Sequence, residues 1–352
     1  MVIMKYCYTF LSILAFALFA SCTNEIDMYD ADKDISFTTS ISKDNGISDT
    51  KSSTAFCNIP FGDGMTLSIE ESDIPDASEN CLTKGMVLDS ENFTEMVGKY
   101  GRLLIASFNK NGNPSIEYFN DIFKHYGNKW EPVRTTVKWP DFPLEIFAFA
   151  AIKGYYDDYG TYIDGYADEI VDNYVDLRTL AKKRVLTYRS DCYSEDLLYA
   201  KAEVPANYSG SFNLNFRHIL TAIKFNTSAN IPSGTVKKIT IKGIPYSYSS
   251  GNAFDTTAEK WEELPDDEEE IGTYDIYFWP NVETESGVSG QALTNEYHTM
   301  FIVPQICREG MNIEIKFQYT GEEEVRTFNI PLESFEFKMG KQVTFSIGGS
   351  NS

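Results

Sequence analysis

Apolar and polar residues alternate with a period of two along much of the chain. The clearest example lies between positions 311 and 319, where polar residues separate five apolar ones: Met311, Ile313, Ile315, Phe317 and Tyr319. Successive side chains of a β-strand point to opposite faces, so this pattern predicts a strand with one buried face. Shorter stretches of the same kind predict strands at 65–69, 144–149, 212–216, 328–332 and 343–347. We therefore predict an all-β fold.

The alternation is interrupted at two places where we expect the chain to change direction. Between Phe216 and Ile223 the apolar residues move from even to odd positions, which predicts a bend or a β-bulge near 218–222. The segment 109–113, with the sequence NKNGN, has the composition of a hairpin tip.

One segment has the spacing of a helix. Six residues fall on one helical stripe: Ile170, Val171, Tyr174, Val175, Ala181 and Val185. Acidic residues occupy its first turns and basic residues its last turn, which suits the helix dipole. Many short strands with one short helical insertion predict two tandem β-sandwich domains. We place their boundary near residue 203, which gives ranges of 35–203 and 204–352.

Residues 1–21 have the features of an export signal. Lys5 precedes an apolar run from Tyr6 to Ala20, which is too short to cross about 30 Å of hydrocarbon as a helix. Small residues precede Cys22, and this arrangement resembles a bacterial lipoprotein signal, in which the new N-terminal cysteine is acylated. An ordinary secretory signal with an incidental Cys22 is the alternative. The acidic segment 22–34 would form a tether, similar to the export tags of surface lipoproteins in the Bacteroidetes.

The charge of the chain excludes one class of partner. With 52 acidic and 30 basic residues, the net charge is −22 and no basic patch is evident. Phosphate backbones and anionic lipid headgroups would repel such a chain, so we expect no nucleic-acid binding.

The cysteines do not form a metal-binding pattern. Four follow Cys22 at wide spacing, with no CxxC motif and no neighbouring histidine: Cys57, Cys81, Cys192 and Cys307. This spacing argues against a zinc site. Cys57 and Cys81 could form a disulfide in an oxidising compartment or could be buried thiols.

We find no motif that predicts catalysis. None of the three histidines, His125, His218 and His298, is spaced for metal binding, and GxSxG, P-loop and GxGxxG motifs are absent. The stretch around Gly165 fails the calcium-loop pattern because Gly160 occupies the position of the first ligand. His218 reads as a structural residue and the acidic run 266–270 as a solvated loop. We predict no catalytic residue, no metal site and no cofactor, although sequence does not reveal the separation of paired carboxylates.

A series of short motifs gives a more specific indication. They occur in this order along the chain: Ile35–Phe37, Thr50–Thr54, Phe61–Leu67, Trp139–Ala150, Asp196–Ala200, Leu214–Phe225, Tyr277–Pro280, Met300–Gln305 and Met339–Phe345. Together they resemble the fimbrillin family, the pilins and pilus components of Bacteroidetes.

This resemblance implies two tandem transthyretin-like β-sandwiches and assembly by β-strand donation. In such pilins a lipidated precursor reaches the cell surface, and a trypsin-like protease cuts after an arginine in the first domain. Removal of the first strand opens a groove that a strand of another subunit fills. Here Lys51 occupies the matching position, so arginine-specific processing is in question. The segment 346–352 is either the donor strand or a frayed end.

The sequence therefore predicts a structural or accessory subunit of an adhesive pilus. The lipid on Cys22 would hold it in the outer membrane, other pilin subunits would be its partners, and it would face host or bacterial surface ligands. The alternative is a non-polymerising surface lipoprotein that binds glycans or anchors a pilus. The four tryptophans and 22 tyrosines would supply a sugar-stacking face, although aromatics at strand spacing are more often core. An acidic glycosidase, which requires two close carboxylates in a cleft, is a second rival.

Overall fold

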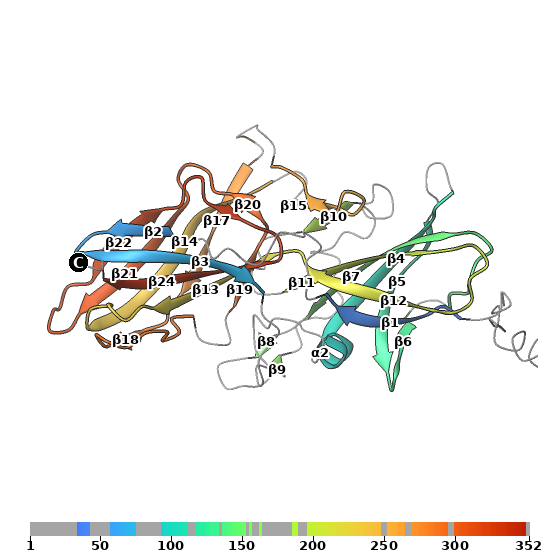
Figure 1. The fold of residues 1–352 in the computed structure, drawn as a ribbon, viewed down its shortest axis with the longest axis horizontal. Helices are drawn as coiled ribbons and strands as arrows, with labels where there is room; N and C mark the ends of the chain where they lie inside the picture. The colour runs from blue at the N-terminus through green and yellow to red at the C-terminus, as the bar shows by residue number, and fades with distance from the viewer. Residues whose placement is uncertain are drawn as a thin grey trace, which may run out of the picture.

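The computed structural model describes most of the chain from Asp34 to Gly349. The described ranges are 34–42, 57–74, 93–111, 117–133, 136–152, 155–156, 162–163, 185–188, 196–247, 252–264, 269, 271–294 and 299–349. In this part of the chain the fold is all-β, with several sheets and one short helix, as the alternation predicts. The predicted signal, the tether and the predicted helix lie outside the described residues, except for Asp34 and Val185. Figure 1 shows two β-rich lobes along the long axis of the molecule.

One lobe is built on a seven-stranded sheet with the order β1-β12-β11-β7-β4-β5-β6. β1 pairs with β12 in parallel, and the other neighbouring pairs are antiparallel. The strands are β1 (Ser36–Ile41), β4 (Gly101–Asn109), β5 (Glu117–Tyr126), β6 (Lys129–Pro132), β7 (Leu144–Ile152), β11 (Leu197–Val204) and β12 (Ser211–His218). β4 and β5 pair antiparallel, and the described part of the predicted hairpin tip, 109–111, lies at the end of β4, while 112–113 lie outside the described residues.

Both faces of this sheet are covered at its centre. In β7, Leu144, Ile146 and Ala148 belong to one hydrophobic cluster, while Phe147 and Phe149 belong to another on the opposite face. Seven consecutive residues of this strand, 144–150, are therefore buried, although the sequence suggested a single buried face.

The helix α2 (Phe93–Tyr100) covers the first of these faces. Phe93 and Val97 lie one turn apart and are buried in the first cluster. A Cβ atom at Gly98 would lie 2.7 Å from the Cβ of His125 on β5, so glycine allows the helix to approach the sheet. Sequence analysis did not predict this helix, because only two apolar residues mark its buried face.

The other lobe is a β-sandwich. One sheet has the order β19-β13-β24-β3-β2, and the facing sheet has the order β17-β14-β21-β22, with β18 paired to β14. Side chains from both sheets form one core, which includes Leu67 and Phe345 from the first and Ile313 and Phe317 from the second. The strands are β2 (Cys57–Phe61), β3 (Met65–Asp73), β13 (Thr221–Thr227), β14 (Gly234–Ser247), β17 (Ile271–Phe278), β18 (Val282–Thr284), β19 (Met300–Ile302), β21 (Asn312–Tyr319), β22 (Arg326–Pro331) and β24 (Lys341–Gly349).

Three small sheets complete the described fold. β10 (Val185–Tyr188), β15 (Asn252–Asp255) and β16 (Lys260–Trp261) form one of them. Phe254 and Trp261 pack against the second face of the seven-stranded sheet. The other two are the pairs β8 (Tyr155–Tyr156) with β9 (Tyr162–Ile163), and β20 (Gln305–Ile306) with β23 (Glu336–Phe337).

The sheets do not follow the predicted boundary in the sequence. β11 extends across residue 203, and it pairs within one sheet both with β7 before the boundary and with β12 after it. The hairpin β2–β3 comes from the first predicted range, but β3 pairs with β24 from Met65–Gly349 to Asp73–Lys341. The ranges 35–203 and 204–352 therefore do not coincide with the strands that make up each lobe. Whether these ranges fold as independent domains stays a prediction.

The predicted bend between positions 218 and 222 is confirmed. β12 ends at His218 in the seven-stranded sheet, and β13 starts at Thr221 in the sandwich. Ile219 and Leu220, which connect them, are fully buried between the lobes' strands. The phase of the apolar pattern changes because the two strands face different cores.

Candidate assembly site

β1 is one of the two edge strands of the seven-stranded sheet and the first strand of the described chain (Figure 1). Six residue pairs, from Ser36–Ser211 to Ile41–Phe216, align it in parallel with β12. On the exposed side of this ladder the Thr38 hydroxyl donates to Asn213 Oδ1 at 3.0 Å. A parallel strand at an edge is held by one ladder only, so its removal disrupts no other pairing within the sheet.

Both ends of β1 form contacts with other segments of the same chain. The backbone N–H of Ile35 donates to the carbonyl of Val137 at 3.0 Å, and that of Ser42 donates to the carbonyl of Phe216 at 2.7 Å. Asp34 forms an ion pair with Lys138 at 2.8 Å. The ion pair is mostly solvent-exposed and adds little to stability. Main-chain bonds and buried side chains therefore provide most of the attachment.

The inward face of β1 closes an aromatic cluster. Phe37 is 8% exposed, and its ring centroid lies 5.4 Å from that of Phe123, 5.7 Å from Phe212 and 6.4 Å from Trp130. Ile35 is buried beside it. Loss of β1 would expose these rings and leave the main-chain edge of β12 unpaired, which is the chemistry of a groove that accepts an extended peptide.

The predicted processing residue Lys51 lies outside the described residues, as do Cys22 and Cys81. The position of Lys51 in the sequence, between β1 and β2, nevertheless determines which strands a cut would separate. β1 ends at Ile41 in one sheet, and β2 begins at Cys57 in a sheet of the other lobe. A cut after Lys51 would therefore sever β1 from the rest of the chain, while β2 and every later strand would stay connected.

The C-terminal strand is in a different situation. β24 lies at the centre of its sheet, parallel to β13 and antiparallel to β3. Val343, Phe345 and Ile347 are fully buried. Residues 341–349 are thus an integral strand in this structure, and 350–352 lie outside the described residues. The predicted donor role of 346–352 stays a prediction.

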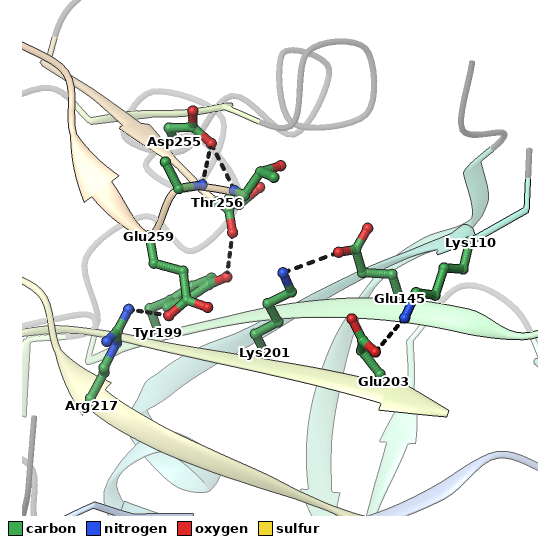
Figure 2. Close-up of polar contacts among 11 residues, drawn as sticks. Lys110, Glu145, Tyr199, Lys201, Glu203, Arg217, Asp255, Thr256 and Glu259 are labelled. Carbon is green, nitrogen blue, oxygen red and sulfur yellow. Dashed lines mark hydrogen bonds and ion pairs between the residues drawn. The ribbon is translucent and has the colours of Figure 1, made fainter. Parts of the chain in front are cut away.

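The second face of the seven-stranded sheet carries a row of polar contacts (Figure 2). Glu145 on β7 and Glu203 on β11 are cross-strand partners, which puts like charges opposite each other. Lys201 lies 3.1 Å from Glu145, and Lys110 pairs with Glu203. The hydrogen bond from Lys110 lowers the pKa of the Glu203 carboxyl. Each carboxylate is neutralised by a lysine, so the pair is a structural feature rather than an acid and base poised for hydrolysis.

Farther along the same face the polar groups join the lobe to β15 and the turn after it. Tyr199 is 1% exposed and its hydroxyl donates to the carbonyl of Thr256 at 2.8 Å. Arg217 pairs with Glu259 and lies over the Tyr199 ring. Burial raises the pKa of Tyr199, so the phenol stays protonated. Figure 2 shows these side chains bridging the strands.

His218 and Cys307 are both buried, whereas of the predicted solvated loop 266–270 the described residues include Glu269 alone, which is exposed. His218 Nδ1 lies 2.9 Å from Asp196, and both side chains are buried, which confirms the structural reading of this histidine. Burial raises the pKa of the free Cys307 thiol to about 12. In the described part of the chain no cluster of three or more metal-ligating side chains occurs. Within the same residues, no helix has the length and apolar character needed to cross a membrane.

Comparison with known proteins identifies the family. The family model described as fimbrillin-like matches residues 105–350. The chain belongs to the fimbrillin-like family. Members of this family are non-enzymatic adhesins, so the chain is not an enzyme. No curated protein sequence is similar enough to be matched.

Several solved structures from Bacteroides align with this fimbrillin-like chain at low identity. A fimbrial protein from Bacteroides vulgatus is 12% identical, with 71% of this chain and 93% of that chain covered and a TM-score of 0.39. A candidate cell adhesion protein from Bacteroides uniformis is 13% identical, with coverage of 73% and 94% and a TM-score of 0.38. Another from Bacteroides fragilis is 10% identical, with coverage of 89% and 90% and a TM-score of 0.40.

Proposed function

We propose that this fimbrillin-like protein is a structural or accessory subunit of a cell-surface adhesive pilus. It is exported as a lipoprotein acylated on Cys22 and held at the outer membrane. Proteolysis after Lys51 then removes the N-terminal segment, and subunits assemble by β-strand donation. The two lobes correspond in this proposal to tandem transthyretin-like sandwiches. The observation that carries the proposal is the position of β1, an edge strand that seals an aromatic cluster and precedes the proposed cut.

The severed β1 would be held without a covalent link. Its main attachments are one parallel ladder, the hydrogen bond from the backbone N–H of Ile35 to the carbonyl of Val137, and the burial of Ile35 and Phe37. A strand from another subunit with apolar residues at alternate positions can form the same contacts, because a strand presents every second side chain to the same face. Replacement of one strand by another restores the ladder and covers the rings, so the exchange needs no external energy source.

In this proposal β1 and β24 have different roles. Release of β24 would break two ladders and expose the fully buried Phe345, whereas release of β1 breaks one. Once β1 has been released, the chain would therefore accept a strand at the β1 site without any change in the sandwich. Donation of its own C-terminal strand would first require the sandwich sheet to open between β13 and β3.

The test is the intact mass and the N-terminal residue of the native protein, measured separately in membranes and in sheared surface fibres. We expect membrane material to begin at acylated Cys22 and fibre material to begin at Ser52. If the acylated form is the sole species and none occurs in fibres, the protein is a fixed surface lipoprotein and the proposal fails. An unacylated membrane form would contradict the lipoprotein step alone.

A further inference from the structure

β17 is an edge strand beside β14 in the sandwich (Figure 1). An exposed aromatic pair, Tyr277 and Trp279, lies at its end. Trp279 is 67% exposed and Tyr277 is 41% exposed. Their ring centroids are 5.6 Å apart and their planes differ by 24°. The neighbouring Ile276 and Phe278 are buried in the core, so the strand itself is anchored while this pair remains in solvent. The fold gains little burial from Trp279.

The orientation of Tyr277 is fixed by hydrogen bonding. Its hydroxyl donates to Asp275 Oδ2 at 3.1 Å. The other oxygen of Asp275 accepts the backbone N–H of Gly243 on β14 at 3.0 Å. Because Asp275 is tied to the adjacent strand, the tyrosine ring is held in place before any ligand arrives, and less conformational entropy is lost on binding.

Two lysines add positive charge next to the aromatic pair. Lys238 Nζ lies 4.4 Å from the centroid of the Tyr277 ring and 5.2 Å from that of Trp279, both within cation–π range. Lys316 on β21 is the cross-strand partner of Lys238. Like charges directly opposite each other are destabilising. Among the described residues neither lysine lies within ion-pair distance of a carboxylate, although the chain carries 52 acidic residues.

We propose that Trp279, Tyr277, Lys238 and Lys316 form a binding site for an acidic saccharide. The apolar C–H face of a pyranose ring would lie against the aromatic rings, whose faces carry partial negative charge. The sugar carboxylate would lie between Lys238 and Lys316 and would neutralise the like-charged pair. This site is in the sandwich, whereas β1 is in the other lobe, so it does not depend on strand exchange (Figure 1).

The net charge of −22 does not prevent local binding of an acidic sugar. At physiological ionic strength charges are screened over about 8 Å. The neighbouring carboxylate, Asp275, already accepts hydrogen bonds from the Tyr277 hydroxyl and the backbone N–H of Gly243. The two adjacent lysines therefore supply the main attraction for a short acidic oligosaccharide, while distant carboxylates act mainly on long polyanions. For this reason a short ligand is the appropriate probe.

The experiment measures binding of sialyllactose and of a short galacturonic acid oligosaccharide to the full-length protein, with lactose as the neutral comparison. Tryptophan fluorescence or calorimetry reports the affinity. We expect the acidic sugars to bind more tightly than lactose. Trp279→Ala should weaken binding of the acidic sugars about tenfold. Lys238→Gln and Lys316→Gln should each weaken it about two- to fivefold and leave the lactose affinity unchanged.

Matched surface variants control for indirect effects. Ile306→Ala removes another large apolar side chain, 65% exposed, and Lys260→Gln removes a lysine elsewhere on the surface. Both should bind like the unsubstituted protein, and all variants should have unchanged melting temperatures because the substituted side chains are outside the cores. Failure of both acidic sugars to bind would overturn the proposal. Equal affinity for lactose, equal losses in the control variants, or tighter binding of an acidic peptide would also overturn it.

Discussion

Truncation of Phe37 tests whether β1 is a strand that seals a groove. Phe37→Ala removes the ring that contacts Phe123, Phe212 and Trp130. Truncation of a fully buried phenylalanine costs about 3–5 kcal/mol. Phe37 lies on an edge strand, where the surroundings can partly collapse, so we expect a loss of about 2–3 kcal/mol in the free energy of unfolding. Urea denaturation followed by tryptophan fluorescence measures this loss.

The same substitution should act on the severed strand. After cleavage at Lys51, a loss of about 2 kcal/mol would make the segment containing β1 dissociate with an equilibrium constant about 30-fold larger. Thr38→Ala is the matched control, because this exposed residue on the same strand contributes one solvent-facing hydrogen bond. It should change the stability by less than about 0.5 kcal/mol. A comparably small effect of Phe37→Ala would refute the idea that β1 closes the aromatic cluster.

Four further substitutions test the lipid anchor, the cut, the C-terminal strand and one buried thiol. Cys22→Ala should abolish lipid labelling and shift the protein out of the membrane fraction; unchanged membrane attachment would remove the lipoprotein step. Lys51→Ala should block both trimming and fibre formation, and normal fibres from this variant would exclude Lys51 from the mechanism. Phe345→Ala should lower the free energy of unfolding by about 3–5 kcal/mol, because its ring is fully buried and stacks 5.0 Å from that of Phe225; a loss under about 1 kcal/mol would contradict a central β24. The folded pKa of Cys307 is about 12, above the ordinary value of 9.0, so its contribution to stability is complete below pH 9 and is lost as the pH rises toward 12. Cys307→Ala should therefore show a flatter decline in urea stability over that range, and parallel curves for the two proteins would count against a buried thiol.

The local alternation of apolar and polar residues was sufficient to predict the strands that have one buried face. β21 and β24 alternate between buried and half-buried residues, and the sequence predicted both. Which strands pair could not be predicted from the sequence. β3 and β24 lie near opposite ends of the described chain, and no local sequence pattern indicates that they are neighbours. The same holds for the parallel contact of β1 with β12. A single sequence contains the apolar pattern of each strand but not the identity of its neighbour.

The candidate site was only partly predictable for a similar reason. Resemblance marked Ile35–Phe37 as a first strand and Lys51 as a processing position, but the rings around Phe37 come from β5, β6 and β12. For Tyr277 and Trp279 the sequence could not separate core from surface, because both kinds of aromatic residue occur at strand spacing. Exposure depends on the edge position of β17, which follows from tertiary structure.

The pairing of β3 with β24 also determines how the protein would respond to mechanical load. β13, β24 and β3 are adjacent in one sheet, and the chain leaves this sheet after β3 and returns to it at β13. Every strand of the seven-stranded sheet except β1 is therefore inserted between two strands that are held together through β24. A pulling force applied at the start of β2 and the end of β24 is carried within the sandwich, so the inserted lobe bears little tension until the β3–β24 ladder separates.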